Sequence, residues 1–308
     1  MKKLTVIIPF LNEGEEVRHT LESMWEHGGE QVEVILVNDA SEDGYDYRQV
    51  AKDFGAQYIE HAERCGVSAS RDEGVEHCAT PFFLFLDGHM RFYTENWINR
   101  IVEELEKDSR QILCCQTKVL NKTDGGKVVE VGNRAKVYGA RIRFCDSEKV
   151  LACEWKLEEA KPGALTEEIP CVLGATYAAS KSYWQYLKGL KGLLCYGSEE
   201  EYMSIKTWLE GGRCLLLKDV VIGHIYRKSF SYSVDMACVF YNKMLIAELL
   251  LPLNLKQQVF KGLEMQNGST YAKAFQLLIE NRELVKQMKG YYHSICKNDF
   301  NLIVQLNS

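Results

Sequence analysis

Phe82-Phe83-Leu84-Phe85-Leu86-Asp87-Gly88-His89 is the stretch of the chain that decides the fold. Its five consecutive apolar residues are typical of a buried strand. The strand pattern ends abruptly in an acid, a glycine and an imidazole. In extended chain, side chains two positions apart point the same way. Asp87 and His89 are therefore expected to face one spot beyond the end of the strand.

Outward from this stretch, the first part of the chain alternates short apolar runs with helical patterns. Strands are expected at Leu4–Ile8, Val32–Val37, Ala56–Ile59, Phe82–Leu86 and Ile112–Gln116, and helices at Glu15–His27, Tyr47–Phe54, Ser68–Cys78 and Glu95–Lys107. This alternation predicts an α/β fold with a mostly parallel central sheet flanked by helices. Ligands of such sheets bind beyond the carboxyl ends of the strands, here at Pro9–Glu13, Asn38–Glu42 and Asp87–His89.

The pattern changes after residue 116. Asp124-Gly125-Gly126 lies between β-branched runs and predicts a hairpin. The stretch 153–170 mixes charges with proline and glycine and predicts a loop. We then expect a strand at Val172–Ala178, a helix at Glu199–Glu210 that stops at a glycine pair, and a short strand at Val220–Ile222.

The last part of the chain is helical in pattern, from Val234 to Ser308, with breaks near Pro252 and Asn267. We therefore divide the chain into residues 1–232 and a C-terminal helical extension of residues 233–308. Apolar positions of the extension fit helix faces that would pack on the first unit, build a homo-oligomer contact or shape a binding site.

Composition narrows the class of protein. The 308 residues carry a net charge of −6 with interspersed acids and bases, so no basic stripe points to nucleic acid. The eleven cysteines show no Cys-x-x-Cys spacing, which favours a reduced, cytoplasmic compartment. No apolar run approaches the ~18 residues of a membrane span, and the N-terminus has no signal-peptide pattern.

A second polar segment, Gly223-His224-Ile225-Tyr226-Arg227, complements Asp87 and His89. Mixed oxygen and nitrogen ligands suit Mn²⁺ better than Mg²⁺ or Ca²⁺, which favour oxygen. His224 could be a third ligand and Arg227 a clamp on a diphosphate, since arginine binds phosphate in a bidentate way. The alternative is an ordinary Asp-Gly turn together with a half-buried core histidine and a surface arginine.

Two further acidic segments have open interpretations. Asp39 directly follows a strand and can accept from a uracil N–H or a ribose hydroxyl, or it can cap a helix. Glu199-Glu200-Glu201 opens a helix, where the helix dipole stabilises negative charge. These glutamates either serve only that purpose or supply a carboxylate facing an acceptor hydroxyl.

Taken in order, these segments resemble the family-2 glycosyltransferases, and most specifically the catalytic domain of the polypeptide N-acetylgalactosaminyltransferases. The matching segments of the first half are Val6–Glu13, Val37–Asp43, Arg64–Gly74 and Phe82–His89. Those of the second half are Gly174–Tyr183, Tyr196–Glu200, Trp208–Gly212 and Gly223–Arg227. Asp87-Gly88-His89 corresponds to the Asp-x-His motif of this family, where most relatives have Asp-x-Asp.

The resemblance implies a GT-A type nucleotide-sugar-binding fold and a role for each matching residue. Asp87, His89 and His224 would bind Mn²⁺, and Arg227 and Tyr232 the diphosphate. The uridine side would be held by Asp39 and Arg71, with Glu199 near the acceptor or the sugar. The remaining donor contacts implied by the matching segments are Pro9, Phe10, Asn12, Glu13, Gly88 and Tyr196.

The implied function is metal-dependent transfer of a hexose or N-acetylhexosamine from a UDP-sugar to an acceptor hydroxyl, with the Asp-x-His pattern favouring retention. The loop Arg227–Val234 would close over the donor. The chain departs from the family at Tyr196, where tryptophan is expected, at Ser198, where glycine is expected, and at Phe230, where histidine is expected. The acceptor, whether a glycan, a peptide or a lipid-linked sugar, is left open.

Three rival functions follow from the same residues. An inverting family-2 enzyme would use Glu200 as the base. A non-catalytic nucleotide-sugar or carbohydrate-binding module would lack a metal or clamp residue, whereas all of these are present. A nucleotidyltransferase would need a glycine-rich, basic loop after the first strand, and Pro9–Glu13 is neither.

Overall fold

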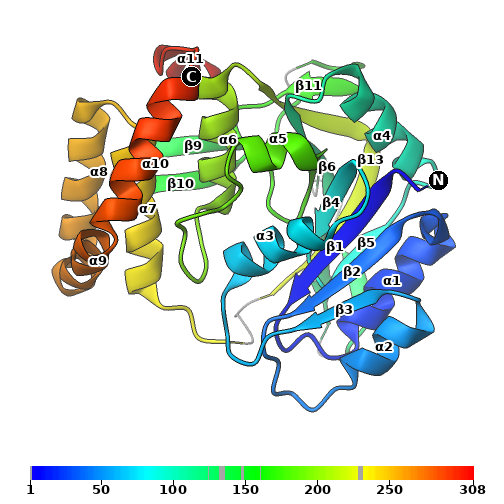
Figure 1. Cartoon of the computed structure of the whole chain (residues 1–308). Helices are drawn as coiled ribbons and strands as arrows, with labels where there is room; N and C mark the ends of the chain where they lie inside the picture. The colour runs from blue at the N-terminus through cyan, green and yellow to red at the C-terminus, as the bar shows by residue number, and fades with distance from the viewer. Residues whose placement is uncertain (1, 124, 132–135, 147–148, 160, 228–231) are drawn as a thin grey trace.

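A computed structural model of the chain describes residues 2–123, 125–131, 136–146, 149–159, 161–227 and 232–308 (Figure 1). Most strands of the described part form one large twisted sheet. They are β1 (Leu4–Phe10), β2 (Glu33–Asn38), β3 (Gln57–Glu60), β4 (Phe82–Leu86), β5 (Met90–Phe92), β6 (Gln111–Lys122), β7 (Val128–Glu130), β8 (Lys136–Val137), β11 (Thr166–Glu168), β12 (Thr176–Ser180) and β13 (Arg213–Tyr226). A separate hairpin consists of β9 (Ala140–Cys145) and β10 (Val150–Trp155).

The strand order along the sheet is β11-β13-β6-β12-β4-β1-β2-β3. The strands β3, β2, β1 and β4 are parallel to one another, as the βα alternation predicts. β12, however, runs antiparallel to both β4 and β6. The α/β class is therefore confirmed, while the mostly parallel arrangement applies to the first half and the whole sheet is mixed.

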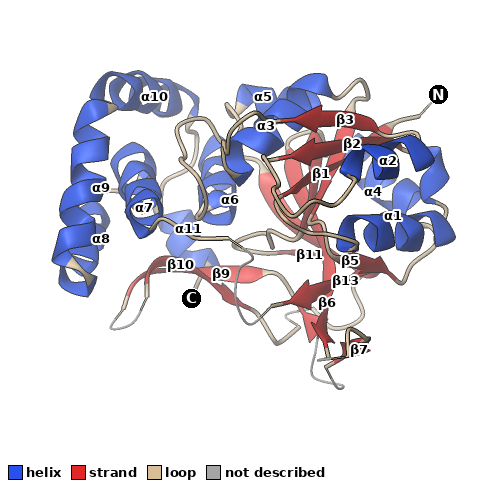
Figure 2. Cartoon of the chain, turned by 90° about the horizontal axis from the view of Figure 1, so that it is seen from below, coloured by secondary structure: helices blue, strands red, loops and turns tan. Residues whose placement is uncertain are grey.

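The helices lie on both faces of the sheet and at one end of the molecule (Figure 2). They are α1 (Glu16–Glu26), a 3₁₀ turn (Gly29–Gln31), α2 (Tyr47–Asp53), α3 (Val67–His77), α4 (Trp97–Lys107), α5 (Lys181–Tyr186), α6 (Glu199–Glu210), α7 (Met236–Leu250), α8 (Leu253–Gln266), α9 (Gly268–Glu280), α10 (Arg282–Ile295) and α11 (Asn301–Leu306). The side chains of β1 alternate between two cores. Leu4, Val6 and Ile8 pack with α1, α2 and α4, whereas Ile7 packs with α3. This period of two follows from strand geometry.

Local predictions are most accurate in the first half, where Phe82–Leu86 is confirmed as β4. The hairpin is also confirmed, because Lys122 pairs with Val128, although Asp124 of its turn lies outside the described residues. The predicted loop 153–170 is wrong in part, since β10 ends within it and β11 lies inside it. The expected strand at 172–178 begins only at Thr176. β13 is much longer than the strand expected at 220–222 because β5, β6 and β11 all pair with it.

The C-terminal helices gather at one end of the molecule, beside the β9–β10 hairpin (Figure 1). Tyr241 and Leu245 of α7 are fully buried and belong to the same core as Tyr177 of β12 and Tyr202 of α6. The division at residue 232 stays a prediction. Among the described residues, no helix has both the length and the apolar character needed to cross a bilayer.

Candidate functional site

Two segments 135 residues apart meet beyond the carboxyl end of β4. β13 pairs antiparallel with β5, so that the backbone N–H of Ile225 donates to the carbonyl of His89 at 3.2 Å. A β-carbon at Gly223 would lie 2.6 Å from Cδ1 of Leu120 on β6, so a side chain there would have to displace this neighbour. The pairing of β13 with β5 brings His224 next to the end of β4.

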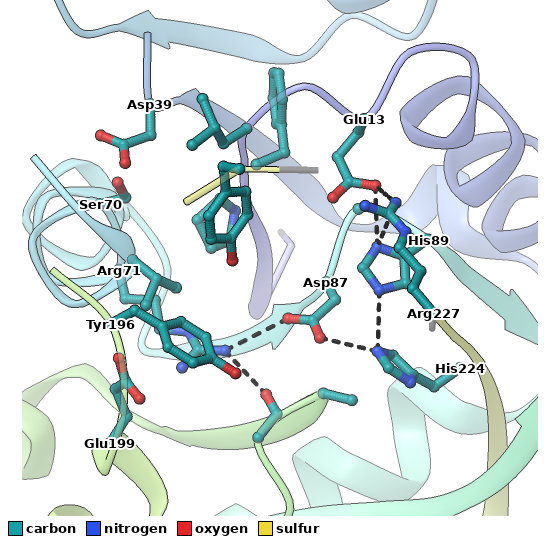
Figure 3. A pocket seen from close by; sticks show the side chains of 18 of the residues that line it. Glu13, Asp39, Ser70, Arg71, Asp87, His89, Tyr196, Glu199, His224 and Arg227 are labelled. Atoms are coloured by element: carbon teal, nitrogen blue, oxygen red, sulfur yellow. Dashed lines mark hydrogen bonds and ion pairs between the residues drawn. The ribbon is translucent and has the colours of Figure 1, made fainter. Parts of the chain in front are cut away.

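Three side chains of types that can ligate a metal ion converge where β5 and β13 pair (Figure 3). Nε2 of His224 lies 3.2 Å from Oδ2 of Asp87 and 3.0 Å from Nε2 of His89. One ligand atom from each residue lies within 4.8 Å of the others. Burial lowers the pKa of His224, which leaves a neutral ring with a lone pair for a cation. Burial alone would raise the pKa of Asp87, but His224, His89 and Arg71 lower it below its usual value.

The ligand atoms of Asp87, His89 and His224 fit a divalent cation. Ligand atoms about 2.1 Å from an ion and at right angles to one another would lie about 3 Å apart, which is the spacing of the two imidazole nitrogens. A site with one carboxylate and two imidazoles suits Mn²⁺ or a similar transition metal. Asp87, His89 and His224 would hold such an ion, as the sequence predicts.

Glu13 and Arg227 support this group from one side. Glu13 Oε2 lies 3.0 Å from Nδ1 of His89 and also forms an ion pair with Arg227. A carboxylate on the second nitrogen of a ligating imidazole fixes the orientation of the ring. Burial alone would raise the pKa of Glu13, but His89 and Arg227 lower it below its usual value. Nη2 of Arg227 also lies 3.3 Å from Nδ1 of His89, so its guanidinium lies beside the three candidate metal ligands.

Arg71 lies beneath Asp87, whereas the sequence predicts it on the uridine side. Its guanidinium is 3.5 Å from Oδ1 of Asp87 and donates to the carbonyl of Gly174 at 3.0 Å. The rings of Phe85 and Tyr177 lie 5.6 and 5.2 Å from the guanidinium carbon. Because Arg71 is 4 % exposed and paired with Asp87, it stabilises the charged form of Asp87.

Asp39 occupies the opposite side of the cavity, next to Ser70 in Figure 3. Its carboxylate accepts from the backbone N–H groups of Cys65 at 2.7 Å and Gly66 at 2.9 Å, just before α3. It also lies 2.8 Å from Nδ1 of His61. A carboxylate offers about four acceptor positions. The described residues occupy three of these positions on Asp39, which leaves one that a ligand could use.

The glutamates at the start of α6 have different surroundings. Glu199 is buried and accepts from Ser68 Oγ at 3.0 Å and from the backbone N–H of Gly197. Glu200 is half-buried against Gly174, where a β-carbon would lie 1.6 Å from its Oε1. Burial, together with Glu199 and Glu201, raises the pKa of Glu200 to about 8.

These residues line one cavity of about 450 Å³. The predicted site residues that line it are Pro9, Phe10, Glu13, Asp39, Arg71, Asp87, Gly88, His89, Tyr196, Glu199, Glu200, His224, Arg227 and Tyr232. Asn12 does not line it. Its side-chain oxygen accepts from the backbone N–H of Glu42 and its own N–H donates to Ser41, which ties two loops together. Residues 228–231 of the predicted closing loop, Phe230 among them, lie outside the described residues.

Several lining residues are absent from the sequence-based prediction. Arg64 lies 4.5 Å from the ring of Tyr232. Trp155, at the end of β10, contacts the ring of Tyr226 with centroids 4.7 Å apart and is 44 % exposed. Arg64 belongs to a matching segment and could have been found from it. Nothing in the sequence places Trp155 here, because its position depends on the hairpin that carries it.

Comparisons with known proteins find related sequences and related folds. A family model described as "Glycosyl transferase family 2" matches residues 5–153. Polypeptide N-acetylgalactosaminyltransferase 10 of Rattus norvegicus is 25 % identical over 240 residues, covering 75 % of this chain and 39 % of the relative. Polypeptide N-acetylgalactosaminyltransferase 4 of Caenorhabditis elegans is 24 % identical over 243 residues, covering 76 % and 40 %. The chain thus spans about two fifths of the length of these relatives.

Solved structures share the fold. A structure of GalNAc-T7 with UDP, GalNAc and Mn²⁺ has a TM-score of 0.76 and 19 % identity, covering 99 % of this chain and 56 % of that one. The mannosyltransferase PcManGT of Pyrobaculum calidifontis, in complex with GDP-Man and Mn²⁺, has a TM-score of 0.53 and 14 % identity, covering 95 % and 85 %. The chain has a GT-A type fold, and the predicted resemblance to the polypeptide N-acetylgalactosaminyltransferases is confirmed in sequence and in fold.

Proposed function

We propose that this chain is a metal-dependent glycosyltransferase that moves a hexose or N-acetylhexosamine from a UDP-sugar to an acceptor hydroxyl with retention. The observation that carries the proposal is the convergence of Asp87, His89 and His224 beside Arg227 in one cavity. The similar proteins and the Mn²⁺ and nucleotide complexes named above support it. The acceptor, whether a glycan, a peptide or a lipid-linked sugar, and a homo-oligomer built through α7–α11 stay predictions.

Residues on one side of the cavity would bind the cation and the diphosphate, and Asp39 on the other side would bind the nucleoside. A divalent cation such as Mn²⁺ would stabilise the charge that develops on the leaving diphosphate. Asp87, His89 and His224 would hold this cation, and the guanidinium of Arg227 would bind diphosphate oxygens from the same side. Asp39 would accept a hydrogen bond from the nucleoside on the other side of the cavity.

The protonation of Glu200 supports a retaining transfer rather than an inverting one. An inverting transfer needs a carboxylate that accepts the proton of the acceptor hydroxyl. With its pKa raised to about 8 by burial and its acidic neighbours, Glu200 is mostly protonated at neutral pH. In a front-face retaining transfer the leaving phosphate accepts this proton, so no carboxylate base is required.

The test is release of the nucleoside diphosphate from a panel of UDP-sugars and GDP-mannose, measured with Mn²⁺ and with EDTA. We expect slow, Mn²⁺-dependent release from one donor by the wild type. The His224→Ala variant should lose at least about a hundredfold of this activity, since the charge on the leaving group would lose its stabilisation. His77→Asn, which removes an exposed histidine of α3, is the matched control and should keep full activity.

Two results would contradict the proposal. One is release that is unaffected by EDTA and by His224→Ala. The other is the absence of both release and Mn²⁺-dependent nucleotide binding with every donor, which would favour a non-catalytic carbohydrate-binding module.

A further inference from the structure

His61 lies outside the sequence-predicted site but contacts it directly. It follows β3, and its side chain is 7 % exposed. Its backbone N–H donates to the carbonyl of Asn38 at 3.0 Å, which places it beside Asp39. Both ring nitrogens face carboxylates: Nδ1 lies 2.8 Å from Asp39 Oδ1, and Nε2 lies 2.7 Å from Glu73 Oε2 on α3.

The protonation of this ring follows from its two partners. A neutral imidazole has one N–H and one lone pair, so it can donate to only one of two ionised carboxylates. Its lone pair would face the other carboxylate, which is a repulsive arrangement. An imidazolium donates to both Asp39 and Glu73. Burial alone would lower the pKa of His61, but its hydrogen bonds to Asp39 and Glu73 raise it above the usual value of 6.5.

We propose that His61 is a positioning residue that, as an imidazolium, holds Asp39 in place for the nucleoside part of the donor. This role rests on the proposed function. Asp39 has three donors, namely the backbone N–H groups of Cys65 and Gly66 and the ring of His61. Only the imidazolium carries a charge, and a charge-assisted hydrogen bond is about twice as strong as a neutral one. His61 itself does not line the cavity and acts through Asp39.

The arrangement predicts how nucleotide affinity varies with pH. Asp39 and Glu73 are the charged groups that face His61 among the described residues. Burial, followed by the effects of Asp39, Glu63 and Glu73, raises the pKa of the neighbouring Cys65, so this thiol stays neutral in the same range. As the pH rises through the raised pKa of His61, the cation is lost and Asp39 loses its charged donor. UDP affinity should therefore decline on the alkaline side of neutrality.

The experiment is calorimetric titration of UDP, in the presence of Mn²⁺, into the full chain across neutral and mildly alkaline pH. The wild type should lose about tenfold in affinity as His61 deprotonates, the size of one charge-assisted hydrogen bond. His61→Asn, which keeps a neutral donor, should show a pH-independent affinity between the two wild-type limits. Glu73→Gln removes one carboxylate and should move the decline to lower pH without changing the affinity below it. His77→Asn should behave as the wild type.

The outcomes separate this role from the proposed function. If the wild type binds UDP with the same affinity throughout this range, and His61→Asn and Glu73→Gln leave the profile unchanged, His61 has no positioning role and the proposed function stands. If the wild type does not bind UDP at any pH with Mn²⁺, the proposed function and the role of His61 are both overturned. The Glu73→Gln shift is a readout that loss of packing would not produce.

Discussion

At the residue scale, the ionisation of Glu200 is set by its neighbours. It lies between Glu199 and Glu201 at the start of α6, and its carboxyl group rests against the backbone of Gly174. Burial and the two adjacent acids favour the protonated form, and Arg71 opposes this effect only in part. A helix N-terminus normally stabilises carboxylates, so here desolvation outweighs the dipole.

For Glu200→Gln we expect near-normal turnover, in contrast to the loss of about a hundredfold or more that follows removal of a general base. Donor turnover of the variant is the measurement. A large loss of turnover, together with loss of the basic limb of the pH profile, would support the inverting mechanism instead.

Glu200→Gln should also change how the free energy of unfolding depends on pH. Between pH 4.5 and about 8 the folded state holds a proton on Glu200 that the unfolded chain has released. The free energy of unfolding therefore falls as the pH rises through this range, and Glu200→Gln should flatten the fall. Urea unfolding at both ends of the range measures it, with the exposed Glu103→Gln as control.

At the element scale, the turn before α3 joins Asp39 to the segment that carries Tyr196. Gly66 has φ +92° and precedes the helix, and the N–H of Val67 donates to the carbonyl of Cys195 at 3.0 Å. This contact joins α3 to the segment that carries Tyr196. The same turn aims the N–H groups of Cys65 and Gly66 at Asp39. One short turn therefore holds the Asp39 side of the cavity together.

Gly66→Ala should be strongly destabilising. A β-carbon at this position would lie 2.3 Å from the carbonyl oxygen of Cys195, and the positive φ adds strain. We expect a loss of about 2–4 kcal/mol in the free energy of unfolding, combining about 1–3 kcal/mol of overpacking with about 1 kcal/mol of backbone strain. UDP affinity should fall as well. Gly44→Ala, with φ +76° and no atom within 4 Å of the added carbon, isolates the strain. Equal losses in both variants would refute the role of the Cys195 contact.

At the scale of the whole molecule, the C-terminal helices and the sheet share one core. Leu245 of α7 is fully buried, and its Cδ2 would lie 3.1 Å from a β-carbon at Gly192. The hydroxyl groups of Tyr292 of α10 and Tyr202 of α6 form a hydrogen bond at 3.1 Å. Lys206 of α6 also donates to the hydroxyl of Tyr292, at 3.4 Å. This packing favours cooperative unfolding of the extension and the rest of the chain.

Leu245→Ala should cost about 2–5 kcal/mol, since it opens a cavity in a shared core. Differential scanning calorimetry should show one transition that moves as a whole to lower temperature. Val304→Ala, at a residue that is 45 % exposed, should move it little. Two transitions, of which only one responds to Leu245→Ala, would instead establish residues 233–308 as an independently folding unit.

The sequence by itself determined the elements of the first half and pointed to Asp87, His89 and His224 as candidate metal ligands. An apolar run such as Phe82–Leu86 predicts a buried strand. A polar residue directly after such a strand indicates the edge of the sheet where ligands bind. The residue types alone suggested His224 as a third ligand but left an ordinary turn and a core histidine as the alternative, and the family resemblance favoured the metal site. Local pattern was therefore sufficient wherever the physical constraint was itself local.

The tertiary structure alone decided which partners these residues have. It placed Arg71 under Asp87, excluded Asn12 from the cavity, extended β13 and brought Trp155 and His61 to the site. These features depend on strand pairing and helix packing between segments far apart in the chain. The pKa of Glu200 likewise depends on burial and on charges that only the fold assembles. The sequence pattern predicts whether a residue is buried. Which residue it contacts depends on how segments far apart in the chain pack together.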